Sequence, residues 1–198
     1  SGDKEGAITM DETENQSITA RLLQSALPHV AFDGWSDMTF RAACEDEAVD
    51  PELALLVCPR GAFDLAVRFH HDGDKEMQKS LIKADIKSMK IRAKVAYAVR
   101  VRLEMIDNKE AVRRTVTLMA LPQYVGEGAG LIWRTCDQIW TALGDDSEDV
   151  NWYTKRLTLS SVYASTVLYW LGDISPNHEA TWAFLDRRIA DVMEFEKL

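Results

Sequence analysis

Apolar residues recur every three or four positions along nearly the whole chain, and this helical spacing is the strongest constraint on the fold. The strict alternation of apolar and polar residues that is typical of β-strands is almost absent. The pattern therefore predicts an all-α protein of about nine helices without a sheet. A chain of 198 residues is also long enough to bury a sizeable core, so it needs neither a metal ion nor a disulfide to fold.

The first part of the chain predicts a helix-turn-helix arrangement at residues 18–70. A helix over 18–32, which Pro28 is expected to kink, precedes a second helix over 37–44 that Ser36 or Asp37 caps. Asp50 and Pro51 then open a short helix through Val57, and a longer helix begins at Ala62. Residues 1–17 are polar and acidic and predict a disordered lead-in, whose Ser1-Gly2 resembles the scar of a cleaved expression tag.

Residues 71–198 predict a larger helical subdomain. Its first helix is expected over 75–106, with the stretch 70–74 (His-His-Asp-Gly-Asp) as a solvated turn before it. A helix over 110–121 follows, and the glycines at 126, 128 and 130 predict a bend or hinge. Three more helices are expected: one ending at Gly144, one over 151–171 and one over 179–195.

The charge distribution argues against nucleic-acid binding. The formal net charge is −9, and residues 18–60 carry three arginines against seven acidic residues, a balance of −4. The predicted recognition helix over 51–57 has no Arg, Lys, Asn or Gln with which to contact a base or a phosphate. We therefore expect a vestigial helix-turn-helix that does not bind DNA.

No constellation of residues predicts catalysis, a metal site or a cofactor. His70 and His71 are adjacent, so their side chains diverge on a helix end, which favours a solvated turn over a metal site. The three cysteines (Cys44, Cys58 and Cys136) form no C-x-x-C pair and are expected to be buried free thiols. No nucleotide-binding or hydrolase motif is present.

Two groups of aromatic residues near the C-terminus stand out. Trp152, Tyr153 and Arg156 lie at the start of a predicted helix, where a partner-binding patch competes with a core face as the interpretation. In the last helix, Trp182 and Leu185 belong to an apolar stripe, whereas Phe184 lies on the other side. Docking on the protein body and contact with a membrane both remain open for that helix.

Several C-terminal segments, taken together, point to a known family. They are Leu-Met-Ala-Leu-Pro at 118–122, Asn-Trp-Tyr-Thr-Lys-Arg at 151–156, Asp-Ile-Ser-Pro at 173–176 and Thr-Trp-Ala-Phe-Leu-Asp-Arg-Arg at 181–188. In this order they resemble the lipid-binding accessory protein of ubiquinone (coenzyme Q) biosynthesis, whose bacterial members form the rpsU-divergently transcribed family. The resemblance covers about residues 18–195.

The resemblance implies a TetR-regulator-like fold, a homodimer and no enzymatic activity. It implies binding of isoprenoid lipid and its presentation to the demethoxyubiquinone hydroxylase at a membrane. By position it assigns partner binding to Trp152, Tyr153 and Arg156. It assigns membrane contact to Trp182, Phe184, Leu185 and Arg188. Because no presequence is visible, we expect a bacterial, cytoplasmic protein that associates peripherally with the membrane.

A lipid carrier needs an apolar hollow and no cofactor beyond its ligand. Apolar spacing suggests as pocket walls Leu118, Met119, Leu121, Leu131, Ile132 and Trp140. The alternative from another class is a TetR-type ligand-responsive transcriptional regulator, which the acidic N-terminal region disfavours.

Overall fold

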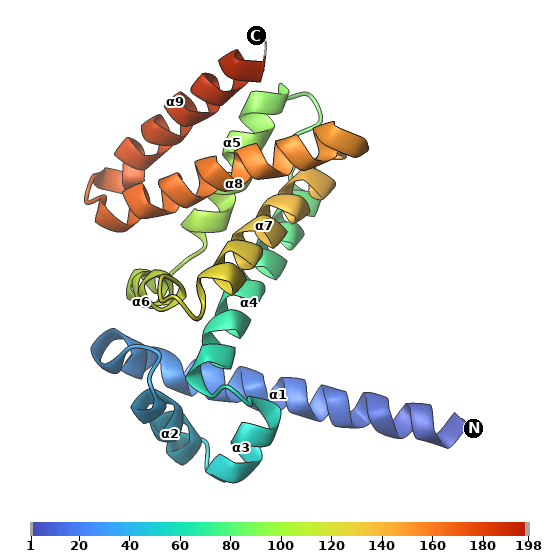
Figure 1. Ribbon diagram of the computed structural model, residues 1–198, viewed down its shortest axis with the longest axis vertical. Helices are drawn as coiled ribbons and strands as arrows, with labels where there is room; N and C mark the ends of the chain where they lie inside the picture. The colour runs from blue at the N-terminus through green and yellow to red at the C-terminus, as the bar shows by residue number, and fades with distance from the viewer. Residues whose placement is uncertain (1, 197–198) are drawn as a thin grey trace. The chain divides into compact units, whose positions relative to one another are not determined.

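The computed structural model describes the backbone of residues 2–196 and the side chains of residues 12–192. Over that range the chain is helical and contains no strand, as the sequence predicted. The elements in order are α1 (Gly2–Asp33), α2 (Asp37–Asp46), α3 (Pro51–Val57), α4 (Ala62–Lys83), α5 (Ile91–Glu104), α6 (Lys109–Met119), α7 (Val125–Ala142), α8 (Asp149–Gly172), the 3-10 helix η1 (Pro176–His178) and α9 (Glu179–Glu196) (Figure 1).

The chain divides into two compact units. The first comprises Ser1–Asp72 and Asn108–Leu118, and the second comprises Gly73–Asp107 and Met119–Leu198. The first unit thus ends two residues beyond the predicted boundary and also takes in most of α6, which the sequence had placed with the C-terminal subdomain.

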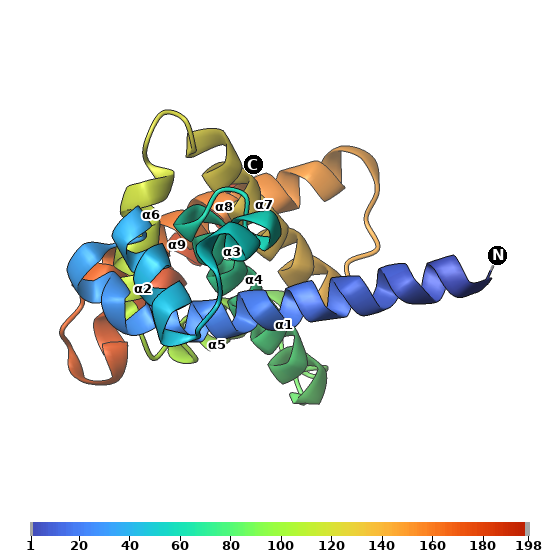
Figure 2. The ribbon, with the colours of Figure 1, turned by 90° about the horizontal axis from the view of Figure 1, so that it is seen from below.

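The first unit is a small helical core around the C-terminal half of α1. Leu22, Leu23, Phe40 and Leu65 are almost completely buried there. Trp35 joins α6 to this core, because its indole Nε1 donates to Thr115 Oγ1 at 2.9 Å. Figure 2 shows α2 and α3 beside α1, the arrangement expected of a helix-turn-helix region.

Two helix starts in this unit follow from local sequence signals. Ser36 Oγ accepts a hydrogen bond from the Thr39 amide at 3.2 Å and caps α2. Asp50 caps α3 by accepting from the Glu52 amide at 2.9 Å, and Pro51 occupies the first turn, where no amide donor is needed. Both predicted caps are therefore confirmed.

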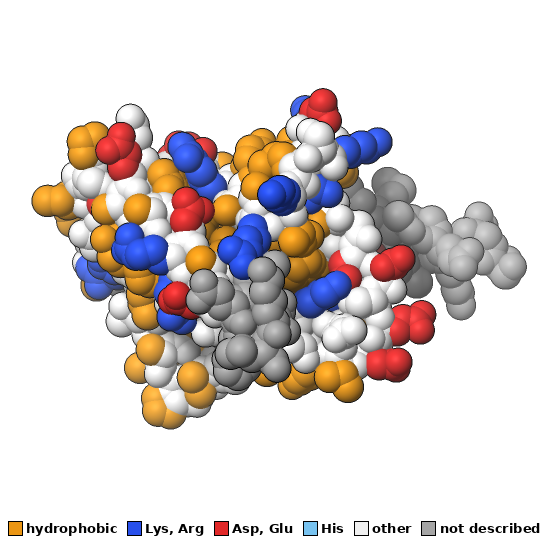
Figure 3. All heavy atoms as spheres, turned by 90° about the horizontal axis from the view of Figure 1, so that it is seen from above, with side chains coloured by type: hydrophobic (Ala, Val, Ile, Leu, Met, Phe, Trp, Pro, Cys, Tyr) orange, Lys and Arg blue, Asp and Glu red, His pale blue; other side chains and the backbone are white. Residues whose placement is uncertain are grey.

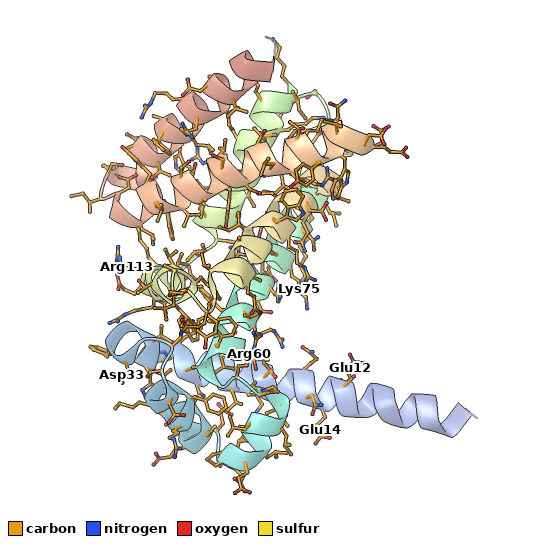
Figure 4. The ribbon with its side chains drawn as sticks, in the orientation of Figure 1. Glu12, Glu14, Asp33, Arg60, Lys75 and Arg113 are labelled. Carbon is orange, nitrogen blue, oxygen red and sulfur yellow. The ribbon has the colours of Figure 1, made fainter. Side chains whose placement is uncertain are left out.

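The predicted disordered lead-in is wrong, because α1 begins at Gly2 and continues through Pro28 to Asp33. No proline or glycine stands between Ala7 and Pro28, and Ala, Glu, Gln and Leu in this stretch favour helix, so the helix can propagate past the core it packs on. Figure 4 shows Glu12 and Glu14 on the part of α1 that extends beyond its neighbours in the first unit.

The second unit packs α5, α7, α8 and α9 against one another, and the last turns of α4 belong to it. α8 contacts both α7 and α9, as the ribbon also shows (Figure 1). Asp173 fixes the start of α9: its carboxylate accepts from the amide and the hydroxyl of Thr181 at 3.0 and 2.6 Å. The predicted final helix is thereby confirmed, with a 3-10 turn before it.

The single long helix predicted over 75–106 is wrong. α4 ends at Lys83, α5 begins at Ile91, and residues 84–90 connect them. Lys79, Lys83, Lys87 and Lys90 would lie three or four positions apart on one helix face, and like charges at that spacing destabilise a helix.

The predicted turn at residues 70–74 is also wrong, because this segment lies inside α4. Gly73 permits Arg102 to lie close to the helix backbone, since a Cβ there would overlap the guanidinium. The Asp74 carboxylate is 2% exposed and accepts from Arg102 Nε at 2.9 Å and from Thr135 Oγ1 at 2.8 Å. A residue interpreted as a solvated turn is therefore part of a buried ion pair.

Candidate functional site

A cavity of about 420 Å³ lies within the second unit, between α5, the C-terminal end of α7, α8 and α9. Its base is apolar and buried, formed by Val95, Leu159, Val162 and Ile189. Its rim is exposed at Ile91, Gly144 and Asp146. This volume falls within the range of roughly 300–1,000 Å³ that small-molecule sites occupy in proteins.

The polar side chains of the cavity have balanced charges. Arg92 and Lys155 are cationic, and Asp145 and Asp146 are anionic. Thr158 adds a hydroxyl. A pocket with an apolar base and a polar rim suits an amphiphile, and the absence of an excess charge suits an uncharged head group with hydrogen-bond acceptors.

Asp145 joins the cavity to a buried ion-pair cluster. Its Oδ1 accepts from Lys155 Nζ at 2.8 Å, and its Oδ2 accepts from Arg156 at 2.9 Å. Arg156 Nε also donates to Asp137 at 2.6 Å. Burial alone raises the pKa of the Asp145 carboxyl, but hydrogen bonds from Lys155, Arg156 and Ser147 outweigh it and hold that pKa well below its usual range. Asp145 therefore stays ionised between the two cations.

Beside this cluster lies an aromatic patch formed by Trp133, Trp152 and Tyr153. The Trp133 ring centroid is 6.1 Å from that of Trp152 and 5.1 Å from that of Tyr153. Trp152 is 37% exposed and Tyr153 is 54% exposed. Exposed Trp and Tyr side chains held in a cluster are typical of the anchors of protein–protein interfaces.

The three residues predicted to bind a partner do not share one environment. Trp152 and Tyr153 are exposed, whereas Arg156 is buried and pairs with two carboxylates. The guanidinium carbon of Arg156 lies 4.2 Å from the centre of the Trp152 ring, so Arg156 supports the patch from beneath. The prediction that Arg156 is available to a partner is corrected accordingly.

Of the six predicted pocket walls, only Trp140 lines the cavity. Leu118 packs on the core of the first unit. In the second unit, Leu121 is largely exposed, Leu131 is buried elsewhere, and Ile132 is half-buried and outside the cavity. The remaining residue, Met119, lies against Gly128. Apolar spacing identifies inward faces but not which faces leave space between them, so five of the six residues lie outside this cavity.

The glycines expected to form a hinge lie inside the helix α7. A Cβ on Gly128 would be 2.8 Å from the Met119 Cβ, so this position is small because the chain before α7 packs on it. The prediction of a bend is therefore wrong.

The four predicted membrane-contact residues also differ in environment. Trp182 and Leu185 are buried, and the Trp182 indole donates to the Asn177 carbonyl at 2.8 Å. Phe184 is half-buried and stacks on Tyr169 with ring centroids 4.5 Å apart. Arg188 is half-buried, and its Nε atom has no hydrogen-bond partner. The inner stripe of α9 thus docks on the protein body.

The sequence had not identified the polar side of the site. No role in the site was predicted for Asp145, and Lys155 was noticed only within the motif at 151–156. The available signal was that two adjacent cations, Lys155 and Arg156, follow Asp145 in the first turns of the next helix and can reach back to its carboxylate. Among the described side chains, no group of three His, Cys, Asp or Glu residues could hold a metal ion. Within the described residues no helix has the length and apolarity needed to cross a membrane.

A solved structure defines the class of protein to which this fold belongs. The crystal structure of a TetR transcriptional regulator from Nitrosomonas europaea superposes with a TM-score of 0.73 at 17% identity, covering 90% of this chain and 99% of that one. The chain therefore has the TetR-regulator fold, as predicted.

The family follows from the sequence relatives. A family model described as COQ9 matches residues 125–196. The ubiquinone biosynthesis protein COQ9-B, mitochondrial, of Xenopus laevis is 30% identical over 96% of this chain and 68% of its own length. The corresponding COQ9 of Drosophila melanogaster is 30% identical over 92% of this chain. The chain belongs to the COQ9 family.

The chain spans 57% of the length of the Drosophila relative and 64% of that of the Rattus norvegicus relative. The names of these relatives place them in mitochondria, whereas the sequence predicted a bacterial cytoplasmic protein. For this chain the compartment stays a prediction.

Proposed function

We propose that this protein acts in ubiquinone biosynthesis as a non-catalytic carrier. It binds an isoprenoid quinone intermediate in the cavity of the second unit and presents it to the demethoxyubiquinone hydroxylase. The observation that carries the proposal is the cavity itself, with its apolar base and charge-balanced rim. Membership in a family whose relatives are named ubiquinone biosynthesis proteins supports the pathway.

The physical need for such a carrier lies in the solubility of the substrate. Each buried CH₂ group resists transfer to water by about 0.8 kcal/mol, so a polyprenyl quinone does not reach a peripheral enzyme through solution. A helical cavity that shields part of the tail and leaves the head group at its rim lowers this barrier without any nucleophile. The rim residues Arg92, Lys155 and Thr158 can donate hydrogen bonds to the carbonyl oxygens of a quinone ring.

The aromatic patch is the proposed docking site for the hydroxylase. Trp152 and Tyr153 supply exposed aromatic surface, and Arg156 fixes the Trp152 ring from below. We expect Tyr153→Ala to weaken hydroxylase binding at least tenfold in a titration of the purified proteins. The control is Thr154→Ala, an exposed neighbour outside the patch.

Peripheral association with a membrane and homodimerisation complete the proposal. The partly exposed Tyr169 stacks on the Phe184 ring, and Arg187 lies 6.0 Å from that ring. On the face drawn in Figure 3, hydrophobic side chains lie among charged side chains of both signs, of which the Lys and Arg side chains suit contacts with lipid phosphates. A second copy would instead cover the exposed stripe of α8 at Val150, Leu157 and Leu168.

A cavity-filling variant tests lipid binding. Thr158→Trp places a large side chain in the cavity, whereas Thr154→Trp places the same side chain one turn earlier at an exposed position. With a ubiquinone that has two isoprene units as the probe, calorimetric titration is expected to show binding by the wild type and by the Thr154 variant and none by Thr158→Trp. Equal binding by both variants would place the lipid elsewhere and overturn the cavity assignment.

The likeness to a TetR regulator favours a second candidate, a ligand-responsive transcriptional regulator. Its recognition helix would be α3, but the exposed side chains there repel phosphate or cannot hydrogen-bond to it: Pro51, Glu52, Leu53, Leu55 and Leu56. A gel-shift titration against the DNA upstream of its own coding sequence separates the two functions. Specific binding at 0.1 M salt would favour the regulator.

A further inference from the structure

Two sites with separate roles in the proposed function are connected by one carboxylate. Lys155 lines the cavity, and its ammonium lies over the cavity-lining Trp140 ring at 5.4 Å. Arg156, the next residue, points to the other side, under the Trp152 ring of the aromatic patch. Asp145 accepts a hydrogen bond from each of these cations through a different oxygen.

We propose that Asp145 couples occupancy of the cavity to the aromatic patch, so that a bound quinone strengthens binding of the hydroxylase. This inference rests on the proposed function and assigns a regulation to it. Asp145 is a positioning residue in this scheme, because it acts on the patch through Arg156.

Competition for Lys155 supplies the coupling. A head group whose oxygen accepts a hydrogen bond from the Lys155 ammonium, which has three N–H donors, draws that ammonium toward the cavity and lengthens its bond to Asp145. The Asp145 side chain is only 3% exposed, so little solvent is available to compensate for the weaker bond. The other donors to Asp145 are Arg156 and Ser147, and the carboxylate moves toward them.

Arg156 carries this change to the patch surface. Its side chain is 2% exposed and donates to the Trp152 carbonyl at 3.0 Å, while its guanidinium stacks on the Trp152 ring. A stronger pull from Asp145 fixes the guanidinium in place and with it the ring above. A ring that is already ordered loses less conformational entropy on contact with a partner, which raises affinity.

Asp137 provides a matched control. It also pairs with Arg156, at 2.6 Å, but it does not line the cavity and forms no hydrogen bond or ion pair with Lys155. Asp137→Asn therefore weakens the support of Arg156 without cutting the connection to the cavity, whereas Asp145→Asn cuts it. Lys155→Met cuts the same connection from the cavity side and leaves the pair between Asp145 and Arg156 in place.

The first measurement needs no partner. In protein labelled with 5-fluorotryptophan, the ¹⁹F signal of Trp140 reports occupancy of the cavity and that of Trp152 reports the patch, with assignments from Trp→Phe variants. Saturation with the ubiquinone of two isoprene units is expected to shift both signals in the wild type and in Asp137→Asn. In Asp145→Asn and Lys155→Met, at concentrations that saturate the Trp140 signal, the Trp152 signal is expected to stay in place.

The second measurement gives the coupling itself. The affinity of the wild type for the hydroxylase is expected to rise by a factor of about five or more when the probe saturates the cavity. The affinity for the probe is expected to rise by the same factor when the hydroxylase is bound. Both factors are expected to fall to one in Lys155→Met, which keeps the pair that holds Arg156.

The outcomes separate the two proposals. The wild type could bind the probe and the hydroxylase with affinities that do not depend on whether the other is bound. That result overturns the coupling and leaves the carrier function standing. Persistent coupling in Lys155→Met overturns the role of Asp145. A wild type that binds neither overturns both proposals.

Discussion

At the scale of single residues, Arg156 is a buried charged side chain whose desolvation is compensated by its ion pairs and hydrogen bonds. Its guanidinium is 2% exposed but forms ion pairs with Asp137 and Asp145 and donates to the Trp152 carbonyl. Removing one partner of such a group leaves an uncompensated charge in a place that water reaches poorly. Without Arg156, the 3% exposed Asp145 would keep only part of its compensation, from Lys155 and Ser147.

We therefore expect Arg156→Ala to lower the free energy of unfolding by about 3 kcal/mol, the scale set by breaking a buried ion pair. Urea denaturation followed by circular dichroism measures the change. Arg41→Ala is the control: Arg41 forms its ion pair with Asp37 at the surface and is 71% exposed, so its loss costs less than about 1 kcal/mol. Equal effects of the two variants would contradict the buried-pair account.

The cysteines follow a simpler rule, since all three are free and buried as the sequence predicted. Burial raises the pKa of the Cys136 thiol to about 12, so almost no thiolate exists at pH 8. We expect Cys136 to resist iodoacetamide at pH 8 in the folded protein and to react fully in 6 M guanidinium, as mass spectrometry of the labelled peptides would show. Rapid labelling of Cys136 in the native state would contradict this prediction.

At the scale of helices, α7 contains three glycines that have different roles. Nothing lies within 4 Å of a Cβ built on Gly126 or Gly130, whereas one on Gly128 meets Met119. Positions 126 and 130 are therefore ordinary helix positions, and glycine is a poor helix former at both. Only Gly128 is required by packing.

We expect Gly126→Ala and Gly130→Ala each to raise the free energy of unfolding by about 0.5–1 kcal/mol, because alanine loses less backbone entropy in a helix. Gly128→Ala is expected to lower it, since the added methyl group overlaps the Met119 Cβ. The three variants differ by the same single methyl group, so thermal unfolding of the set isolates packing from propensity. A stabilising effect at position 128 would show that the contact with Met119 yields at little cost.

At the scale of the whole molecule, acid stability depends on carboxylates of the second unit. Burial raises the pKa of Asp173, but hydrogen bonds from Ser175 and Thr181 outweigh it and hold the pKa below its usual range, as at Asp145. A depressed folded-state pKa adds stability that is present above the unfolded-state pKa of about 3.9 and is lost as the pH falls below it toward the folded-state value.

The free energy of unfolding of the wild type is therefore expected to be nearly constant from pH 7 to pH 5 as far as these two groups contribute, and to decline below about pH 4. Asp173→Asn should be less stable than the wild type at pH 7, and the difference should shrink as the pH falls below 4. Urea titrations between pH 3 and pH 7 test this. A difference that is the same at pH 3 and pH 7 would exclude ionised Asp173 as its source.

Much of the fold could be predicted from the sequence because its signals are local. The caps at Ser36 and Asp50 act through one turn of chain, and the apolar stripe of α9 is set by the helical period. The lack of phosphate-binding side chains in α3 is likewise a property of seven consecutive residues. Each of these features depends only on residues that are close together in the sequence.

The site was predicted only in part because it depends on contacts between distant residues. Trp152 and Tyr153 were identified by their type and position, but the burial of Arg156 requires Asp137 from α7 and Asp145 from the loop that follows α7. The burial of Asp74 likewise depends on its ion pair with Arg102, which is 28 positions away in the sequence.

By itself the sequence determined the all-helical class, the caps at Ser36 and Asp50, the family and the lack of phosphate-binding side chains in α3, but it misplaced the start of α1 and missed the break between α4 and α5. The tertiary structure decided where space remains: the cavity exists because faces of α5, α7, α8 and α9 meet without filling the volume between them. Periodicity says which side of a helix turns inward, but the depth of contact between two inward sides depends on every side chain that they share.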